Sequence, residues 1–316
     1  MSAAGISRIA VVGAGLVGRA WAIVFARAGF AVGAYDESPA TRAGVASAIE
    51  RSLHELTEFK LLDEPVATVL ARIRVESSLA GVLEGSGYVQ ESVIENVDVK
   101  RTVHASIASA AATGTIQASS TSGIPASQWS EGLSNRAYCL VAHPINPPHV
   151  VPLVEICGAP WTSPEVVEQV VALQKAAGQS PVVLRKEVTG FVANRLQGAL
   201  LSEAFRLHAD GVASVEDIDK TIRDGLGLRW SFMGPLETID LNAPRGIADY
   251  CARFGPLYYR LAEEAKPRRW DEGLVKAIET ERRQVLPEGE LEARSTWRDR
   301  RLMGLMGFKR GSDVCR

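Results

Sequence analysis

The stretch Gly13-Ala14-Gly15-Leu16-Val17-Gly18 decides the fold that this sequence predicts. It follows the apolar run 9–12 and opens a segment with helical spacing, so a strand precedes it and a helix follows it. A second β-rich run ends at Asp36, eighteen positions after Gly18 (36 − 18). Glycines at this spacing, followed by an acid about 20 residues later, predict the first turn of a doubly wound α/β fold that binds a dinucleotide.

The parts of this turn have separate physical tasks. Gly13 permits the tight turn, Gly15 lets the backbone approach a pyrophosphate, and Gly18 permits close packing of the helix on the strand. Asp36 is expected to hydrogen-bond both ribose hydroxyls of the adenosine and, with Glu37, to repel a 2′-phosphate. The sequence therefore predicts NAD rather than NADP as cofactor. The alternative is a glycine-rich turn without a ligand, and the complete strand–helix–strand context favours bound NAD.

Short β-rich runs alternate with longer helical patterns up to about residue 185. The candidate strands cover 8–12, 31–35, 73–75, 88–90, 115–118, 138–141, 154–156 and 182–184, with helical patterns at 17–28, 39–62, 97–112 and 164–177. This alternation predicts a Rossmann-type sheet that is mostly parallel. From Gly190 onward the spacing is helical, broken by Gly-Pro at 234–235 and 255–256. We expect a Rossmann domain over 1–187 and an all-helical domain over 188–316.

The composition is that of an ordinary globular protein. Of the 316 residues, 46% are apolar and 23% are charged. The formal net charge of −2 gives no reason to expect nucleic acid or a membrane surface as a partner. The cysteines are scattered without metal-ligand spacing, so we expect no metal site, free and mostly buried thiols, and a reducing, cytoplasmic location. They are Cys139, Cys157, Cys251 and Cys315.

One imidazole stands where a strand should end. His143 opens the proline-stiffened stretch His143-Pro144-Ile145-Asn146-Pro147-Pro148, and Glu155 follows twelve positions later (155 − 143). Histidine titrates near neutral pH, and a carboxylate on one ring nitrogen fixes the tautomer and raises the basicity. The pair therefore predicts a general base for hydride transfer from a hydroxyl. A structural role for His143, capping the proline loop, is the alternative reading of the same residue.

Four other histidines compete for that role. His149 lies later in the same loop and is the rival base, although it lacks the anchor of a strand end. His54, His104 and His208 lie within helical patterns, where a surface or packing role is the usual one.

At this point the sequence resembles the 3-hydroxyacyl-CoA dehydrogenase family. The motifs that carry the resemblance lie at 13–18, Asp36, 95–100, 119–122, 143–148, 152–155, 190–195 and 234–237. They run in order from the N-terminus to about residue 240. The resemblance implies that His143 is the general base for a 3-hydroxyl and that Glu155 orients it. It also implies that Ser122 hydrogen-bonds the reacting oxygen and that Asn194 holds the substrate from the other side.

The resemblance implies cofactor contacts as well. The positions are Glu95, Lys100 and Asn146 at the nicotinamide end of NAD, and Leu16 and Val17 on the pyrophosphate turn. Hydride would pass from substrate C3 to nicotinamide C4. The helical domain would form the contact of a homodimer.

The chain departs from the acyl-CoA members of the family at 51–60. Those members are lysine-rich there, where they meet CoA, whereas this chain has Phe59 at the position of a CoA-contacting lysine. Glu55 and Glu58 also disfavour a polyphosphate. Segments 141–144, 225–230 and 297–299 are instead similar to the branch of the family that oxidises L-gulonate. We expect a small free 3-hydroxy acid as substrate, L-gulonate first, with a short-chain 3-hydroxyacyl-CoA or a carnitine-like acid as alternatives.

Arg229 is the candidate ligand of a substrate carboxylate, because an arginine can bind a carboxylate through two parallel hydrogen bonds. A surface salt bridge at the end of a helix is its alternative role.

The basic C-terminal segment, which includes Arg298 and Lys309, has apolar residues interleaved and predicts a docked amphipathic helix. A non-enzymatic, NAD-binding protein of crystallin type is the remaining alternative, and the complete set of four catalytic positions argues against it.

Overall fold

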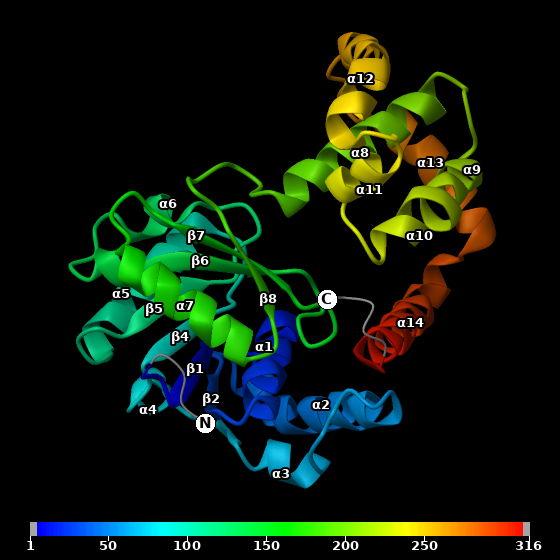
Figure 1. Ribbon diagram of the computed structural model, residues 1–316. Coiled ribbons are helices and arrows are strands. Elements are labelled where there is room, and N and C mark those ends of the chain that lie inside the picture. The colour runs from blue at the N-terminus through cyan, green and yellow to red at the C-terminus, as the bar shows by residue number, and fades with distance from the viewer. Residues whose placement is uncertain (1–4, 312–316) are drawn as a thin grey trace. The chain divides into compact units, whose positions relative to one another are not determined.

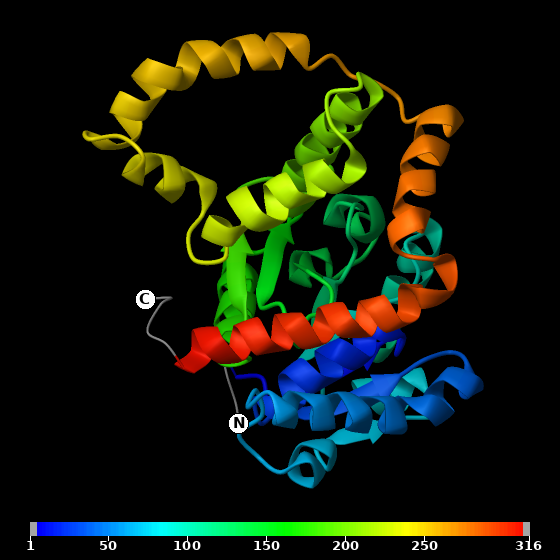
Figure 2. The same ribbon diagram turned by 90° about the vertical axis from the view of Figure 1, so that its right-hand side faces the viewer.

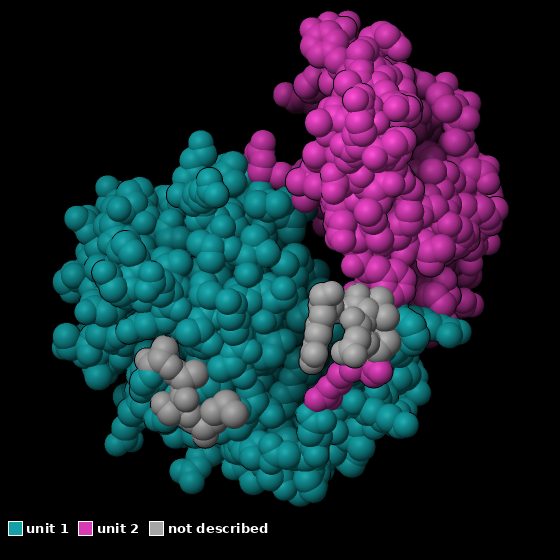
Figure 3. All heavy atoms as spheres, in the orientation of Figure 1, with its two compact units in different colours: residues 1–194, 298–308 teal, residues 195–297, 309–316 magenta. Residues whose placement is uncertain are grey.

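A computed structural model describes residues 5–311 of the chain (Figure 1). The described residues divide into two compact units (Figure 3), one of 5–194 with 298–308 and one of 195–297 with 309–311. The assignment of cofactor binding to 1–187 and of substrate binding and dimerisation to 188–316 stays a prediction.

The first unit is built on one eight-stranded sheet with the order β3-β2-β1-β4-β5-β6-β7-β8. The strands are β1 Arg8–Val12, β2 Ala31–Tyr35, β3 Ile73–Val75, β4 Tyr88–Glu91, β5 Ile116–Ser119, β6 Cys139–Pro144, β7 Leu153–Gly158 and β8 Ser180–Val183. All neighbouring strands pair in parallel except β6 and β7, which are antiparallel. The predicted Rossmann-type, mostly parallel sheet is confirmed.

Helices cover both faces of this sheet. They are α1 Leu16–Arg27, α2 Pro39–Glu58, α3 Val66–Leu70, α4 Leu79–Leu83, α5 Val97–Ala110, α6 Ala126–Ser130, the 3₁₀ turn η1 Arg136–Tyr138 and α7 Pro164–Ala176. Alternate residues of β1 face two different cores, Ile9 toward α1, α2 and α7 and Ala10 toward α4 and α5. Local signals set the helix starts, since Ser38 caps α2 and Asn96 caps α5 by accepting backbone N–H groups.

The described part of the second unit consists of helices without a strand, as expected. They are α8 Ala193–Ala209, α9 Val215–Lys220, the π-helical turn η2 Thr221–Leu226, α10 Gly227–Trp230, α11 Pro235–Leu241, α12 Gly246–Glu264, α13 Glu272–Val285, the 3₁₀ turn η3 Glu288–Glu290 and the two ends of α14 Leu291–Gly311. The break expected at Gly-Pro 255–256 is wrong, because Pro256 lies inside α12. Proline removes one backbone hydrogen bond there without ending the helix.

The middle of α14, residues 298–308, belongs to the first unit and packs against its core (Figure 2). Met303 is fully buried, and Leu302 and Met306 contact the same core as α1 and α2. A Cβ added at Gly307 would lie 2.8 Å from the carbonyl oxygen of Phe59, so only glycine permits this close approach. The predicted docked amphipathic helix is confirmed over these residues. Between residues 5 and 311, no helix is long and apolar enough to cross a membrane.

Two of the cysteines are buried free thiols. Burial raises the pKa of Cys139 to about 12 and that of Cys157 to about 11, so both stay protonated at neutral pH. Cys251 is exposed, because it lies on an uncovered side of α12, which corrects the expectation of a buried residue. Cys315 lies outside the described residues.

Candidate active site

The glycine turn between β1 and α1 leaves room for a phosphate group. A Cβ at Gly13 would lie 2.7 Å from the carbonyl of Ser92, and one at Gly18 would lie 1.8 Å from the Gly13 oxygen. Gly13 also has a φ of +91°, which favours glycine. No atom lies within 4 Å of the Cβ position of Gly15. The turn is therefore closed beneath and open where the N-terminus of α1, beginning at the exposed Leu16, presents free N–H groups.

Asp36 is held beside this turn at the end of β2. Its Oδ2 accepts a hydrogen bond from the Ala14 N–H at 2.9 Å, and its Oδ1 accepts one from the Ser38 N–H at 3.0 Å. Each carboxylate oxygen can still accept a further hydrogen bond, which suits a pair of ribose hydroxyls. These residues fit the adenosine and pyrophosphate of NAD.

His143 and Glu155 form the hydrogen-bonded pair that the sequence predicts. They lie directly opposite each other in the antiparallel pairing of β6 and β7, and Nδ1 of His143 is 2.8 Å from Oε2 of Glu155. His143 therefore lies inside β6, since this strand continues to Pro144 rather than ending before His143 as expected. Both side chains are nearly buried. Within the described chain, Nε2 of His143 has no hydrogen-bond partner and is the nitrogen left to take a proton.

Glu155 also holds the start of α8. Its Oε1 accepts backbone N–H groups from Val192 at 2.7 Å and Ala193 at 3.0 Å. Burial raises the pKa of Glu155, but the hydrogen bonds from His143 and from these two N–H groups leave that pKa below its usual value. The carboxylate is therefore ionised at neutral pH.

The loop after β5 joins two further predicted residues. The Asn194 Nδ2 donates to the backbone oxygen of Ser122 at 2.6 Å. Oε1 of Glu95 accepts from the Ser122 N–H at 3.0 Å, the Gly123 N–H at 3.0 Å and the Thr121 hydroxyl at 2.7 Å. The structure thus brings Ser122, Asn194 and Glu95 together, with the Ser122 hydroxyl exposed on the loop.

His149 is a poor candidate for the base. Burial lowers its pKa to about 4, and the charge of Arg27 adds to this. Arg27 donates to the backbone oxygen of His149 at 2.7 Å, which fixes the loop against α1. No carboxylate is hydrogen-bonded to its ring among the described residues. His149 is therefore neutral at pH 7 and only weakly basic.

A buried charge cluster that sequence reasoning missed lies beneath the loop of Ser122. Glu91 at the end of β4 pairs with Lys100 at 2.9 Å, and His104 Nε2 is 3.3 Å from Glu91 Oε2. Burial raises the pKa of Glu91, but His104, Lys100 and Ser119 together lower it to about 2. His104 was expected to have a surface or packing role. A helical pattern alone does not reveal that its side chain meets a buried acid on the sheet.

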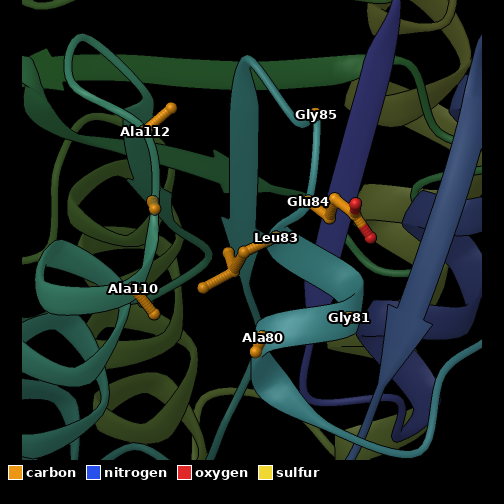
Figure 4. A pocket seen from close by; sticks show the side chains of 8 residues that line it. Ala80, Gly81, Leu83, Glu84, Gly85, Ala110 and Ala112 are labelled. Carbon is orange, nitrogen blue, oxygen red and sulfur yellow. The ribbon is translucent and has the colours of Figure 1, made fainter.

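Two further predicted residues take no part in these hydrogen bonds. Asn146 is exposed in the loop between β6 and β7, and Arg229 is exposed in α10 of the second unit. A shallow hollow is lined by segments that come before β4 and β5 in the chain, among them Leu83, Glu84 and the alanines at 110–112 (Figure 4). It lies at the amino ends of these strands, whereas the predicted site residues lie toward the carboxyl ends, where α/β sheets bind ligands.

Two family models match the chain. The 3-hydroxyacyl-CoA dehydrogenase NAD binding domain matches residues 8–188, and the C-terminal domain of the same family matches residues 190–285. The chain therefore belongs to the 3-hydroxyacyl-CoA dehydrogenase family, which confirms the resemblance of its motifs. It is an NAD-dependent hydroxy acid dehydrogenase.

Individual relatives agree with this assignment. The chain is 41% identical over 306 residues to the lambda-crystallin homolog of Bos taurus, covering 95% of each chain. It is 36% identical over 252 residues to an L-carnitine dehydrogenase of Streptomyces griseus, covering 79% of this chain and 74% of the relative. A solved 5-formyl-3-hydroxy-2-methylpyridine 4-carboxylic acid 5-dehydrogenase is similar in structure, with a TM-score of 0.84 and 27% identity, covering 97% of this chain and 99% of the other.

Replacing Asp36 tests the cofactor site. In Asp36→Ala the ribose hydroxyls lose a charged acceptor, whose hydrogen bonds contribute about 1.5–3 kcal/mol, so the NADH dissociation constant should rise about tenfold or more. The gap between NADH and NADPH affinity should narrow, because a negative charge is removed. Fluorescence titration measures both constants. Glu50→Ala, which removes an exposed acid of α2 that has no expected contact with the cofactor, serves as the control, and unchanged affinities in Asp36→Ala contradict the assignment.

Proposed function

We propose that this dehydrogenase oxidises the 3-hydroxyl of a small free hydroxy acid, with L-gulonate to 3-dehydro-L-gulonate as the first candidate. The observation that carries the proposal is the pairing of His143 with the ionised, buried Glu155, which leaves Nε2 of His143 as the free base. All four positions of the implied catalytic set are present, and hydrogen bonds join them in two pairs, His143 with Glu155 and Asn194 with Ser122.

His143 Nε2 accepts the hydroxyl proton in this mechanism. The Glu155 carboxylate holds the Nδ1 proton and stabilises the imidazolium that forms. The Ser122 hydroxyl and the Asn194 amide orient the reacting oxygen. Bound NAD supplies the acceptor for the hydride.

A free acid is favoured over a CoA thioester by the packing around Phe59. Arg300 of α14 pairs with Glu58 at 2.8 Å and lies over the Phe59 ring at 5.0 Å. Gly304 and Gly307 approach Phe59 closely from the same helix. The end of α2, where acyl-CoA members of the family meet their substrate, is thus covered in this chain. This supports a substrate without a polyphosphate tail.

Arg229 supports recognition of a carboxylate. It is exposed, and among the described residues its guanidinium has no acidic partner. The alternative role as part of a surface salt bridge therefore has no support. An unpaired guanidinium presents both donors needed to bind a carboxylate.

The base assignment predicts a selective loss of chemistry. His143→Gln removes the proton acceptor, so kcat should fall by about 10²-fold or more while the NADH dissociation constant stays within about twofold. His149→Gln should change kcat by less than about threefold, because His149 lacks a carboxylate partner. Steady-state kinetics and NADH titration measure these quantities. A comparable loss of kcat in His149→Gln alone would move the role to His149.

The substrate assignment predicts turnover of free acids. NADH formation should be measured with L-gulonate, 3-hydroxybutyrate, L-carnitine and 3-hydroxybutyryl-CoA in parallel, and L-gulonate should give the highest kcat/KM. Arg229→Lys should raise KM for the preferred acid about tenfold, equivalent to about 1.4 kcal/mol, since lysine cannot form the two parallel hydrogen bonds. Arg223→Lys, which alters an arginine already paired with Asp224, is the matched control. Preference for the thioester, or an unchanged KM in Arg229→Lys, contradicts the proposal.

We also propose that the protein is cytoplasmic, which is consistent with its free thiols.

We further propose that the second unit forms a homodimer through α12. Four large side chains on α12 recur at helical spacing and are each more than 40% exposed: Phe254, Leu257, Tyr258 and Leu261. An apolar stripe of this kind on a stable protein indicates a partner surface, and a self-complementary contact is the commonest one.

A charged side chain introduced into this apolar stripe of α12 should dissociate the dimer into monomers. The wild-type chain should show twice the monomer mass in size-exclusion chromatography with light scattering, and Leu257→Glu should show the monomer mass, because a carboxylate would be buried in the contact. Val285→Glu places the same charge on an exposed site of α13 and should remain dimeric. A monomeric wild type refutes the assignment.

A further inference from the structure

We propose that His104 is a positioning residue that fixes the loop of Ser122 through a buried chain of charged groups; this inference rests on the proposed function. His104 is fully buried on α5, and its ring stacks on Trp129 of α6 with centroids 3.8 Å apart and planes 16° apart. The two ring nitrogens face Gln117 Oε1 at 2.8 Å and Glu91 Oε2 at 3.3 Å. Stacking and hydrogen bonding together leave the imidazole one orientation.

Glu91 is the group on which His104 acts. Its carboxylate is ionised and therefore only accepts hydrogen bonds, so the Nε2 of His104 donates to it. The same carboxylate accepts from Lys100 Nζ at 2.9 and 3.1 Å and from the Ser119 hydroxyl at 2.5 Å. A buried carboxylate is costly unless each lone pair is matched. Loss of the His104 donor therefore displaces or protonates Glu91.

Two sets of contacts connect Glu91 with the loop of Ser122. In the first, Lys100 lies 3.6 Å from Glu95 Oε2, and Glu95 Oε1 accepts from the Ser122 and Gly123 N–H groups. In the second, the Ser119 hydroxyl that donates to Glu91 accepts from the Thr121 N–H at 3.2 Å.

Through these contacts the cluster of His104, Glu91 and Lys100 holds the loop of Ser122 in place, in addition to filling the interior. The charged groups that face His104 and Glu91 in the described chain are Lys100 from α5 and, through Lys100, Glu95. The groups from β5 and α6 are uncharged. Glu95 and Lys100 are implied contacts of the nicotinamide end of NAD. The cluster therefore determines how firmly the cofactor and the reacting hydroxyl are held.

The test compares His104→Phe with wild type. Phenylalanine can still stack on Trp129 but cannot donate to Glu91. The NADH dissociation constant should rise about fivefold or more and kcat/KM should fall about tenfold. Glu91 loses a hydrogen bond that lowers its pKa, so it is protonated at a higher pH. The acid limb of the NADH-binding profile, which is the pH range in which affinity falls on acidification, should therefore move to higher pH. His104→Gln retains one N–H donor and should restore most of the affinity.

Controls separate positioning from stability. Ser130→Ala removes a buried hydroxyl one residue from Trp129 that does not contact Glu91, and it should leave the NADH affinity and the acid limb unchanged. NADH affinity within about twofold of wild type in folded His104→Phe, with an unshifted acid limb, overturns the proposal. If His104→Phe does not fold, Gln117→Leu decides, since it removes the other partner of the ring. It should weaken NADH binding about threefold, and unchanged binding overturns the proposal.

The two proposals fail in different ways. If the wild type oxidises no hydroxy acid, the proposed function fails. The NADH affinities of the His104 variants still decide the present inference, because NAD binding does not depend on the identity of the substrate.

Discussion

The hydrogen bonds of Glu155 hold the candidate site together, because its two carboxylate oxygens face different parts of the chain. Oε2 faces His143, while Oε1 accepts two N–H groups where α8 begins. A helix N-terminus favours an anion whether or not a cation is nearby. Glu155 therefore stays ionised when His143 is neutral as well as when it is protonated. This is what a base needs in order to take up a proton and release it again.

A second buried acid on the same sheet is compensated differently. Glu91 is matched by the ammonium of Lys100 and by hydroxyl and imidazole donors, without a helix N-terminus. Lysine keeps its charge through a reaction at neutral pH, so this pair gives a fixed arrangement. We propose that the fold separates two tasks: the pair with the titratable histidine serves proton transfer, and the pair with lysine supports the loop that bears Ser122.

Sequence reasoning located the strands and the glycine turn because those signals are local. It also paired His143 with Glu155, but the cause of the pairing was not visible, since antiparallel register between β6 and β7 is a tertiary property. The same limit applies to His104: the packing role that the sequence favoured is present, but its hydrogen bond to Glu91 depends on which strand its helix covers. Pro256 shows the opposite case, in which a strong local signal for a helix end is overridden by the helix around it.

Substrate choice cannot reside in the groups that move the proton, because a hydroxyl looks alike to His143 in a free acid and in a thioester. Substrate choice must depend on the protein surface that contacts the rest of the substrate, beyond the reacting hydroxyl. We propose that the end of α2 is part of that surface; α14 covers it, because Gly307 approaches the backbone of Phe59 and Arg300 pairs with Glu58. Replacing Phe59 by lysine would therefore not create a site for CoA, since the added charge would face a packed helix rather than open solvent. We propose that the C-terminal helix, far in sequence from the candidate catalytic residues, carries that part of the specificity.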